Sequence, residues 1–334
     1  MTTYHKTLIT LLLLFCTTNL FAQDKSADVP TLIKEGRALN TTGKYTEAVA
    51  KFDEALKIDP NNTDVMENKG ISLALAQKYD EALPCFEKVV AVNNNQPHAY
   101  VSMGNIYSMR KDYDKAIYYY TKAIGILPRD ARIWNSLSSA YLFSKKYAQA
   151  QSAATETIKM GQRQANVYQL YAIAAFFQAK NAEALMGLCN YFMLANPKEK
   201  STADTYRTLT LVLHDKPRPG AEPVAKMQQE TVAKAIASAT EGKTNLTPID
   251  SLTLQLTAAF KAINEQQDQY GSPFFSKYFG SFFGTMAATD QMDTFAHFIM
   301  LSISPAENAA WLKEHQDKVT AFVSWIKSTK REIE

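Results

Sequence analysis

Glycine and proline are scarce in this sequence. Each occurs 12 times among 334 residues, together about 7% of the chain, whereas roughly 12% is ordinary. A fold made of many short strands needs more turn residues than this, so a β-sandwich or β-barrel is disfavoured. An excess of one charge is also lacking. The 36 Lys and Arg against 33 Asp and Glu leave a formal charge of +3, too weak a basic field to predict nucleic-acid binding.

Long hydrophobic runs are lacking as well. The run at residues 8–15 is far shorter than the roughly 20 residues that a membrane-spanning helix needs. It follows Lys6 and leads through small and polar residues to Ala22, which is the arrangement of a secretory signal peptide. We therefore expect residues 1–22 to direct export, with cleavage after Ala22 or Gln23 and no membrane span in the mature chain.

Cysteine occurs only three times. Cys16 leaves open a retained or lipid-modified N-terminus, although the bulky Phe15 stands where a lipobox needs a small residue. Cys85 and Cys189 lie three repeats apart in the pattern described next, which is too far for a disulfide. We expect both to be small buried side chains with free thiols.

A repeat of constant length occupies the middle of the chain. Its five segments start 34 residues apart without insertion, at Val29, Thr63, Pro97, Ala131 and Ala165. The eighth residue of each segment is small: Gly36, Gly70, Gly104, Ser138 and Ala172. The twentieth is always alanine: Ala48, Ala82, Ala116, Ala150 and Ala184. The twenty-fourth is mostly large: Phe52, Phe86, Tyr120, Ala154 and Leu188.

These spacings predict two amphipathic helices in each segment, because large residues recur every three or four positions in two runs. Small residues at the eighth and twentieth positions allow the two helices to cross closely. Large residues fill the space between one pair and the next. Thr46, Asp80 and Asp114 stand where we expect the N-caps of the second helices.

The pattern resembles the tetratricopeptide repeat family, with repeats at 29–62, 63–96, 97–130, 131–164 and 165–198. The fifth repeat is degenerate, because Asn181 replaces the tyrosine that the other four carry at this position: Tyr45, Tyr79, Tyr113 and Tyr147. The resemblance implies an all-α protein, a right-handed solenoid of five helical hairpins. It also implies that the first helices line a concave groove, which binds a peptide or a partner helix.

Carried over by repeat position, the groove residues are polar and mixed in charge at first and more apolar toward the last repeat. They are Arg37, Asn40, Asp64, Glu67, Ile71, Leu75, His98, Val101, Asn105, Met109, Arg132, Asn135, Ser139, Phe143, Asn166, Gln169, Ile173, Phe176 and Phe177. For Phe143, Phe176 and Phe177 the alternative is that later helices of the same chain cover them.

The remaining residues predict helices without a repeat. We expect a capping helix at 199–216, because the last unit of such an array must close its exposed face, and a helical C-terminal domain of unknown role at 220–334. Two aromatic stripes mark this domain, at Phe274, Tyr278 and Phe282 and at Phe275, Phe279 and Phe283, with Gly280 and Gly284 allowing a close neighbour. A packed core is the expected role. If exposed, such a patch is typical of a partner or membrane-surface site.

No constellation in the sequence indicates catalysis, a cofactor or a metal. The sequence contains no zinc-protease helix motif, no glycine-rich phosphate loop and no nucleophile elbow. Asp293 and His297 lie one helical turn apart, but such pairs are common by chance and do not indicate a catalytic site. The sequence therefore predicts a non-catalytic scaffold that binds a protein or peptide of the cell envelope. Its organisation resembles envelope tetratricopeptide proteins of Gram-negative bacteria, which indicates the periplasm. The alternative is an enzyme or membrane-surface module in the C-terminal domain, for which the repeats recruit a partner.

Overall fold

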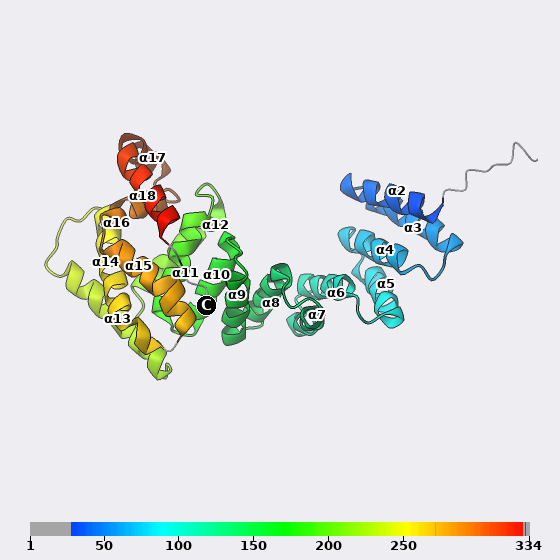
Figure 1. Ribbon diagram of the computed structural model, residues 1–334, viewed down its shortest axis with the longest axis horizontal. Coiled ribbons are helices and arrows are strands. Elements are labelled where there is room, and N and C mark those ends of the chain that lie inside the picture. The colour runs from blue at the N-terminus through cyan, green and yellow to red at the C-terminus, as the bar shows by residue number, and fades with distance from the viewer. Residues whose placement is uncertain (1–27, 271, 330, 332–334) are drawn as a thin grey trace, which may run out of the picture. The chain divides into compact units, whose positions relative to one another are not determined.

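The computed structural model describes residues 28–270, 272–329 and 331. Helices account for all regular structure in these ranges, which confirms the all-α prediction (Figure 1). The five repeats form five helical hairpins, as predicted: α2 (Val29–Thr41) with α3 (Tyr45–Ile58), α4 (Thr63–Leu75) with α5 (Tyr79–Val92), α6 (Pro97–Met109) with α7 (Tyr113–Ile126), α8 (Ala131–Phe143) with α9 (Tyr147–Lys159), and α10 (Ala165–Phe177) with α11 (Asn181–Leu194).

Further helices follow the last hairpin. They are α12 (Lys200–Leu213), α13 (Pro223–Thr240), α14 (Pro248–Gln266), the 3₁₀ turn η1 (Gln267–Tyr270), the π-helix η2 (Phe275–Gly280), α15 (Ser281–Ala287), α16 (Gln291–Met300), α17 (Pro305–Glu314) and α18 (Gln316–Ser328). None of the described helices is long and apolar enough to cross a bilayer. The chain divides into two compact units inside α6, between Ile106 and Tyr107.

Close packing within the hairpins depends on the eighth residue of the repeat. A Cβ atom added to Gly36 would lie 2.5 Å from Cζ of Phe52, and one added to Gly70 would lie 2.8 Å from Cζ of Phe86. Each phenylalanine stands at the twenty-fourth position and is fully buried. The alanines at the twentieth position are also fully buried in all five repeats. The predicted close crossing of the paired helices is therefore present.

The turn inside each hairpin corrects the predicted helix starts. Thr46, Asp80 and Asp114 are not N-caps, because the second helices begin one residue before them and are preceded by Lys44, Lys78 and Asp112. The residue before the cap has a left-handed backbone, with φ of 76° at Gly43, 61° at Gln77 and 61° at Lys111. The N–H of the cap residue then donates to the first helix, for example from Lys78 to the carbonyl of Leu73 at 2.8 Å. The second helix therefore starts before the predicted caps, and of the three cap residues only Asp112 uses its side chain, which accepts from the N–H of Lys115 at 3.2 Å.

Helix α11 lies at the centre of the second unit. Every residue from Asn181 to Phe192 is buried, because α10, α12, α13, α16 and η2 all pack against it. The second helix of a repeat normally keeps one face for solvent, whereas this one is enclosed on all sides. One apolar core consequently runs from α9 to α18 without a break.

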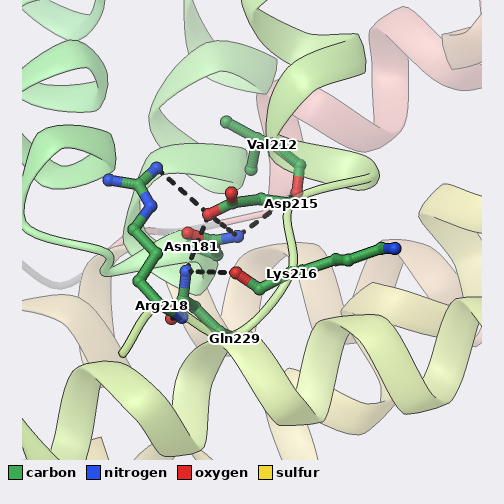
Figure 2. Close-up of polar contacts among 6 residues, drawn as sticks. All are labelled: Asn181, Val212, Asp215, Lys216, Arg218 and Gln229. Carbon is green, nitrogen blue, oxygen red and sulfur yellow. Dashed lines mark hydrogen bonds and ion pairs between the residues drawn. The ribbon is translucent and has the colours of Figure 1, made fainter. Parts of the chain in front are cut away.

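Buried polar residues connect α11 to the segments around it. Asn181 donates from Nδ2 to Asp215 at 3.1 Å and to the carbonyl of Val212 at 3.3 Å (Figure 2). The same carboxylate of Asp215 accepts from Arg218 at 3.1 Å and from Gln229 at 2.7 Å. The turn at 217–220, which lies between the predicted capping helix and the predicted C-terminal domain, is therefore tied to α11 and α13 by hydrogen bonds. The departure from tyrosine at Asn181 has a structural reason, since the side chain binds the loop after α12.

The aromatic stripes form core, as expected. Five of their six side chains, all except Phe274, are buried, and Phe274 is partly buried against the same core. The segment is not one regular α-helix, because residues 275–280 form a π-helical turn before α15. The two glycines lie against other side chains as predicted. A Cβ atom at Gly284 would lie 2.3 Å from Cγ of Asn264 on α14.

Candidate functional site

Within each compact unit the first helices of neighbouring repeats contact each other, α2 with α4 in the first unit and α8 with α10 in the second. The predicted residues that are exposed are Arg37, Asp64, Leu75, His98, Asn105, Met109, Arg132, Phe143, Asn166 and Phe177. Those that are partly buried are Asn40, Glu67, Ile71, Val101, Asn135, Ser139, Gln169, Ile173 and Phe176. All nineteen keep some exposed surface, which a binding face requires.

In the first unit these positions carry an ion-pair network. Arg37 on α2 donates to the carboxylate of Asp64 on α4 at 3.0 Å and to Oδ1 of Asn68 at 2.8 Å. Partial burial raises the pKa of Glu67 above its usual value, against the opposing charge of His98. The oxygen Oδ1 of Asn40 is buried without a hydrogen-bond donor among the described residues. Both signs of charge therefore stand on this face, together with one unused acceptor.

In the second unit the predicted positions surround a polar hollow of about 340 Å³. Asn135 and Ser139 lie one turn apart on α8, and Asn166 and Gln169 face them from α10. In the part of the chain that the structure describes, the lining consists of Ser108, Tyr120, Asn135, Ser136, Ser139, Asn166, Gln169 and Leu170. Every polar group in this lining is a neutral amide or hydroxyl. The hollow can therefore donate and accept hydrogen bonds but provides no formal charge.

Asn135 is the least satisfied of these side chains. Its Oδ1 atom is buried and accepts no hydrogen bond from any described residue. A buried acceptor without a donor costs about 1–3 kcal/mol, so such groups are usually paired in the functional state. Gln169 differs, because its Nε2 already donates to Oγ1 of Thr205 on α12 at 2.7 Å. Asn135 is therefore the side chain in this hollow with an unused buried hydrogen-bond acceptor, its Oδ1 atom.

The apolar end of the predicted groove is only partly covered by later helices. Phe143 stacks on Tyr113 at 5.4 Å between ring centroids and stays 60% exposed. Phe177 stacks on Tyr147 at 4.6 Å and stays 51% exposed. Phe176 instead packs against the large core, with the guanidinium of Arg218 4.5 Å from its ring. Of the three phenylalanines, only Phe176 is therefore covered by later parts of the same chain.

Several residues of this surface were missed from the sequence. Ser108 and Tyr120 line the hollow although neither was assigned to the groove, and Tyr113 and Tyr147 support the exposed phenylalanines. A signal for the tyrosines was present, because both stand at the same position of their repeats. Tyr120 stands at the twenty-fourth position of its repeat, which predicted packing between helices and not a place in the groove, and no repeat position marked Ser108.

The C-terminal helices use their polar and aromatic groups internally. The Nδ1 atom of His297 lies 2.7 Å from Oδ1 of Asn308, and its ring stacks on Trp311 at 3.7 Å between centroids. Asp293 is 3.9 Å from the other ring nitrogen and 3.2 Å from Lys318. Within the described ranges no group of three or more His, Cys, Asp or Glu could hold a metal ion. Cys85 is a half-buried free thiol and Cys189 a buried one.

Known proteins resemble this chain in part. Two sequence profiles described as tetratricopeptide repeat match it, one at residues 29–62 and one at 62–129. A structure of MamA 41-end from Desulfovibrio magneticus RS-1 is 17% identical, covering 57% of this chain and 97% of its own, with a TM-score of 0.44. Another MamA crystal structure is 21% identical, covering 53% and 94% respectively, with a TM-score of 0.46. No curated protein gives a significant match.

Proposed function

We propose that this chain, whose residues 29–129 match tetratricopeptide-repeat profiles, is a non-catalytic scaffold that binds an extended peptide segment of a partner through the first helices of its repeats. The proposal is supported above all by the buried, unused acceptor of Asn135 in a neutral polar hollow. A peptide backbone presents one N–H donor per residue, which is the group that this acceptor lacks.

The neighbouring surface supports the same occupant. The hollow offers amide and hydroxyl groups for a backbone, while the exposed Phe143 and Phe177 offer apolar contact for side chains. Polar contacts fix orientation and apolar contacts supply area, which is the usual division in peptide recognition.

Replacing Asn135 by leucine separates binding from folding. The variant removes the unused buried acceptor, so the free energy of unfolding should stay the same or rise slightly. Affinity for a partner should fall several-fold, because the lost hydrogen bond is worth about 0.5–1.5 kcal/mol. Calorimetric titration with a captured partner and urea denaturation of both proteins measure the two effects.

A photo-crosslinker placed in cells identifies that partner. Benzoylphenylalanine at position 139, inside the hollow, should yield a discrete crosslinked species, whereas the same group at the exposed Lys122 on α7 should not. Asn135→Leu should weaken the first crosslink. If positions 139 and 122 give the same products, or if the leucine variant crosslinks equally well, the hollow is not the binding site.

We further propose that the chain is exported and acts in the cell envelope. Support comes from the sequence at residues 1–22, which lie outside the described residues. N-terminal sequencing of protein purified from its native cells should begin at Gln23 or Asp24. A chain that still begins at Met1 and fractionates with cytoplasmic markers would contradict export.

A further inference from the structure

A partly buried arginine, Arg331, returns to the last repeat. The guanidinium carbon of Arg331 lies 3.7 Å from the ring centroid of Phe282 and 5.4 Å from that of Tyr278. Its nitrogens donate to Oδ1 of Asn190 and, at 3.9 Å, to the sulfur of Met193, both on α11. Asn190 is itself held by a hydrogen bond to the carbonyl of Met186 at 2.8 Å. The guanidinium is therefore fixed in one orientation.

No carboxylate among the described residues pairs with this guanidinium. Burial is the main cause that lowers the pKa of Arg331, and the positive charge of Arg163 acts in the same direction. A buried cation without a counter-ion is costly. Arginine nonetheless stays protonated in proteins. The positive charge of Arg331 therefore lies near the positive charge of Arg163.

A small hollow adjoins both arginines. Its volume is about 100 Å³, several times the roughly 10–15 Å³ that one water molecule needs. Tyr168 lies on its wall, and the hydroxyl of Tyr168 is 2.6 Å from that of Tyr278. Among the described residues, the lining consists of Arg163, Tyr168, Asn190, Met193, Leu194, Ile326, Thr329 and Arg331.

This lining combines cationic and apolar groups. Two guanidiniums are hydrogen-bond donors that suit a carboxylate, which arginine binds in a bidentate manner. The hydroxyl of Tyr168 adds a third donor only when the hydroxyl of Tyr278 donates to it. Met193, Leu194 and Ile326 form a wall that suits a short hydrocarbon chain. Inorganic phosphate would match the cations but would gain nothing from the apolar wall.

We propose that this hollow is a binding site for a short aliphatic carboxylate, with Arg331 and Arg163 holding the carboxylate and the side chains of Met193, Leu194 and Ile326 holding the hydrocarbon tail. The site lies apart from the polar hollow of the repeats, since the two share no lining residue. The proposal of a carboxylate site therefore does not depend on the proposal that the repeats bind a peptide.

The test uses the full chain and butyrate as the probe. Thermal melts at constant ionic strength should show the melting temperature rising with butyrate and levelling off, because a ligand of the native state stabilises it by mass action. Acetate should act at higher concentration than butyrate, and phosphate least. Equal effects of phosphate and butyrate would overturn the assignment to a carboxylate, and the lack of any saturable shift would overturn the site.

Three variants locate the effect. Arg163→Gln changes an exposed side chain and should weaken butyrate binding about tenfold, the scale of one charge-assisted hydrogen bond. Arg331→Met should abolish the shift, and its unliganded melt shows whether it folds. Arg207→Gln alters an exposed arginine on α12 paired with Asp204 and should bind like the parent. Unchanged binding in both Arg163→Gln and Arg331→Met would contradict the proposal.

The chain itself contains a competing counter-ion. Glu332 and Glu334 follow Arg331 in the sequence and lie outside the described residues. The double variant Glu332→Gln, Glu334→Gln should bind butyrate as the parent does, or more tightly. If the parent fails to bind butyrate and only the double variant binds it, the hollow serves an internal carboxylate and the proposed ligand is wrong.

Discussion

At the scale of single residues, the eighth position of the repeat holds the paired helices together in two different ways. Gly70 faces Phe86 with no space for a methyl group. In the fourth repeat the twenty-fourth residue is only Ala154, and the eighth is Ser138, whose hydroxyl donates to the carbonyl of Ala150 at 2.8 Å. The contact between the helices is thus apolar packing in the second repeat and includes a hydrogen bond in the fourth.

Gly70→Ala should destabilise the first unit. The added Cβ would stand 2.8 Å from Cζ of Phe86, and the ring is fully buried and has no free space to move into. Overpacking of this kind costs about 1–3 kcal/mol, which exceeds the roughly 0.5–1 kcal/mol gained when alanine replaces glycine in a helix. Urea denaturation followed by circular dichroism measures the difference.

Gly125→Ala is the matched control. Gly125 also lies in a helix, α7, but nothing stands within 4 Å of an added Cβ. This substitution should leave stability unchanged or raise it by up to about 1 kcal/mol. Destabilisation by both substitutions to the same extent would mean that helix backbone, and not the contact with Phe86, sets the cost at Gly70.

At the scale of elements, the hairpin that contains helix α11 was predictable from the sequence, whereas the enclosure of α11 by later helices was not. Hairpin bounds followed from the 34-residue period, because each hairpin is determined by contacts close in sequence. Enclosure of α11 depends on α13 and α16, far along the chain, and no local period encodes it. One exception was visible in the sequence, since Asn181 departs from the repeat, but only the fold shows that its side chain contacts Asp215.

The candidate site was predictable to a similar degree. Repeat position alone brought Asn135, Ser139, Asn166 and Gln169 to one hollow. It gave no information on which of them would be occupied, because the bond from Gln169 to Thr205 crosses from a repeat to α12. The interpretation of Phe176 as groove or covered surface stayed open for the same reason.

Asp215→Ala tests the polar connection around α11. It removes an acceptor shared by Asn181, Arg218 and Gln229. Buried donors left with poorer partners should lower the free energy of unfolding by about 1–3 kcal/mol. Asp204→Ala is the control, because Asp204 forms an exposed pair with Arg207 on α12, and such pairs contribute at most about 1 kcal/mol. Equal losses in the two variants would argue against a special role for Asp215.

At the scale of the whole chain, the second unit should unfold as one. Its core joins the last repeats to the C-terminal helices without interruption, so neither part can lose its packing alone. Trp134 lies in α8, and Trp325 lies in α18 with its ring 5.0 Å from that of Phe282. These two residues report on opposite ends of the unit's sequence.

Phe260→Ala should lower the urea midpoint of both tryptophans together. Phe260 is fully buried against Phe283, with ring centroids 4.7 Å apart, and such truncation costs about 3–5 kcal/mol. Fluorescence of variants that keep a single tryptophan, with phenylalanine at the other two positions, separates the signals. A shift at Trp325 without one at Trp134 would show that the repeats unfold independently of the C-terminal helices.

The enclosure of α11 also limits how such a protein can evolve. A helical array lengthens when a duplicated unit stacks on an open terminal face, and residues 181–192 leave no such face after the fifth hairpin. Growth or loss of repeats is therefore confined to earlier hairpins. Variation in the number of repeats among related chains should then occur upstream of α8, with the segment from α9 onward inherited as a block.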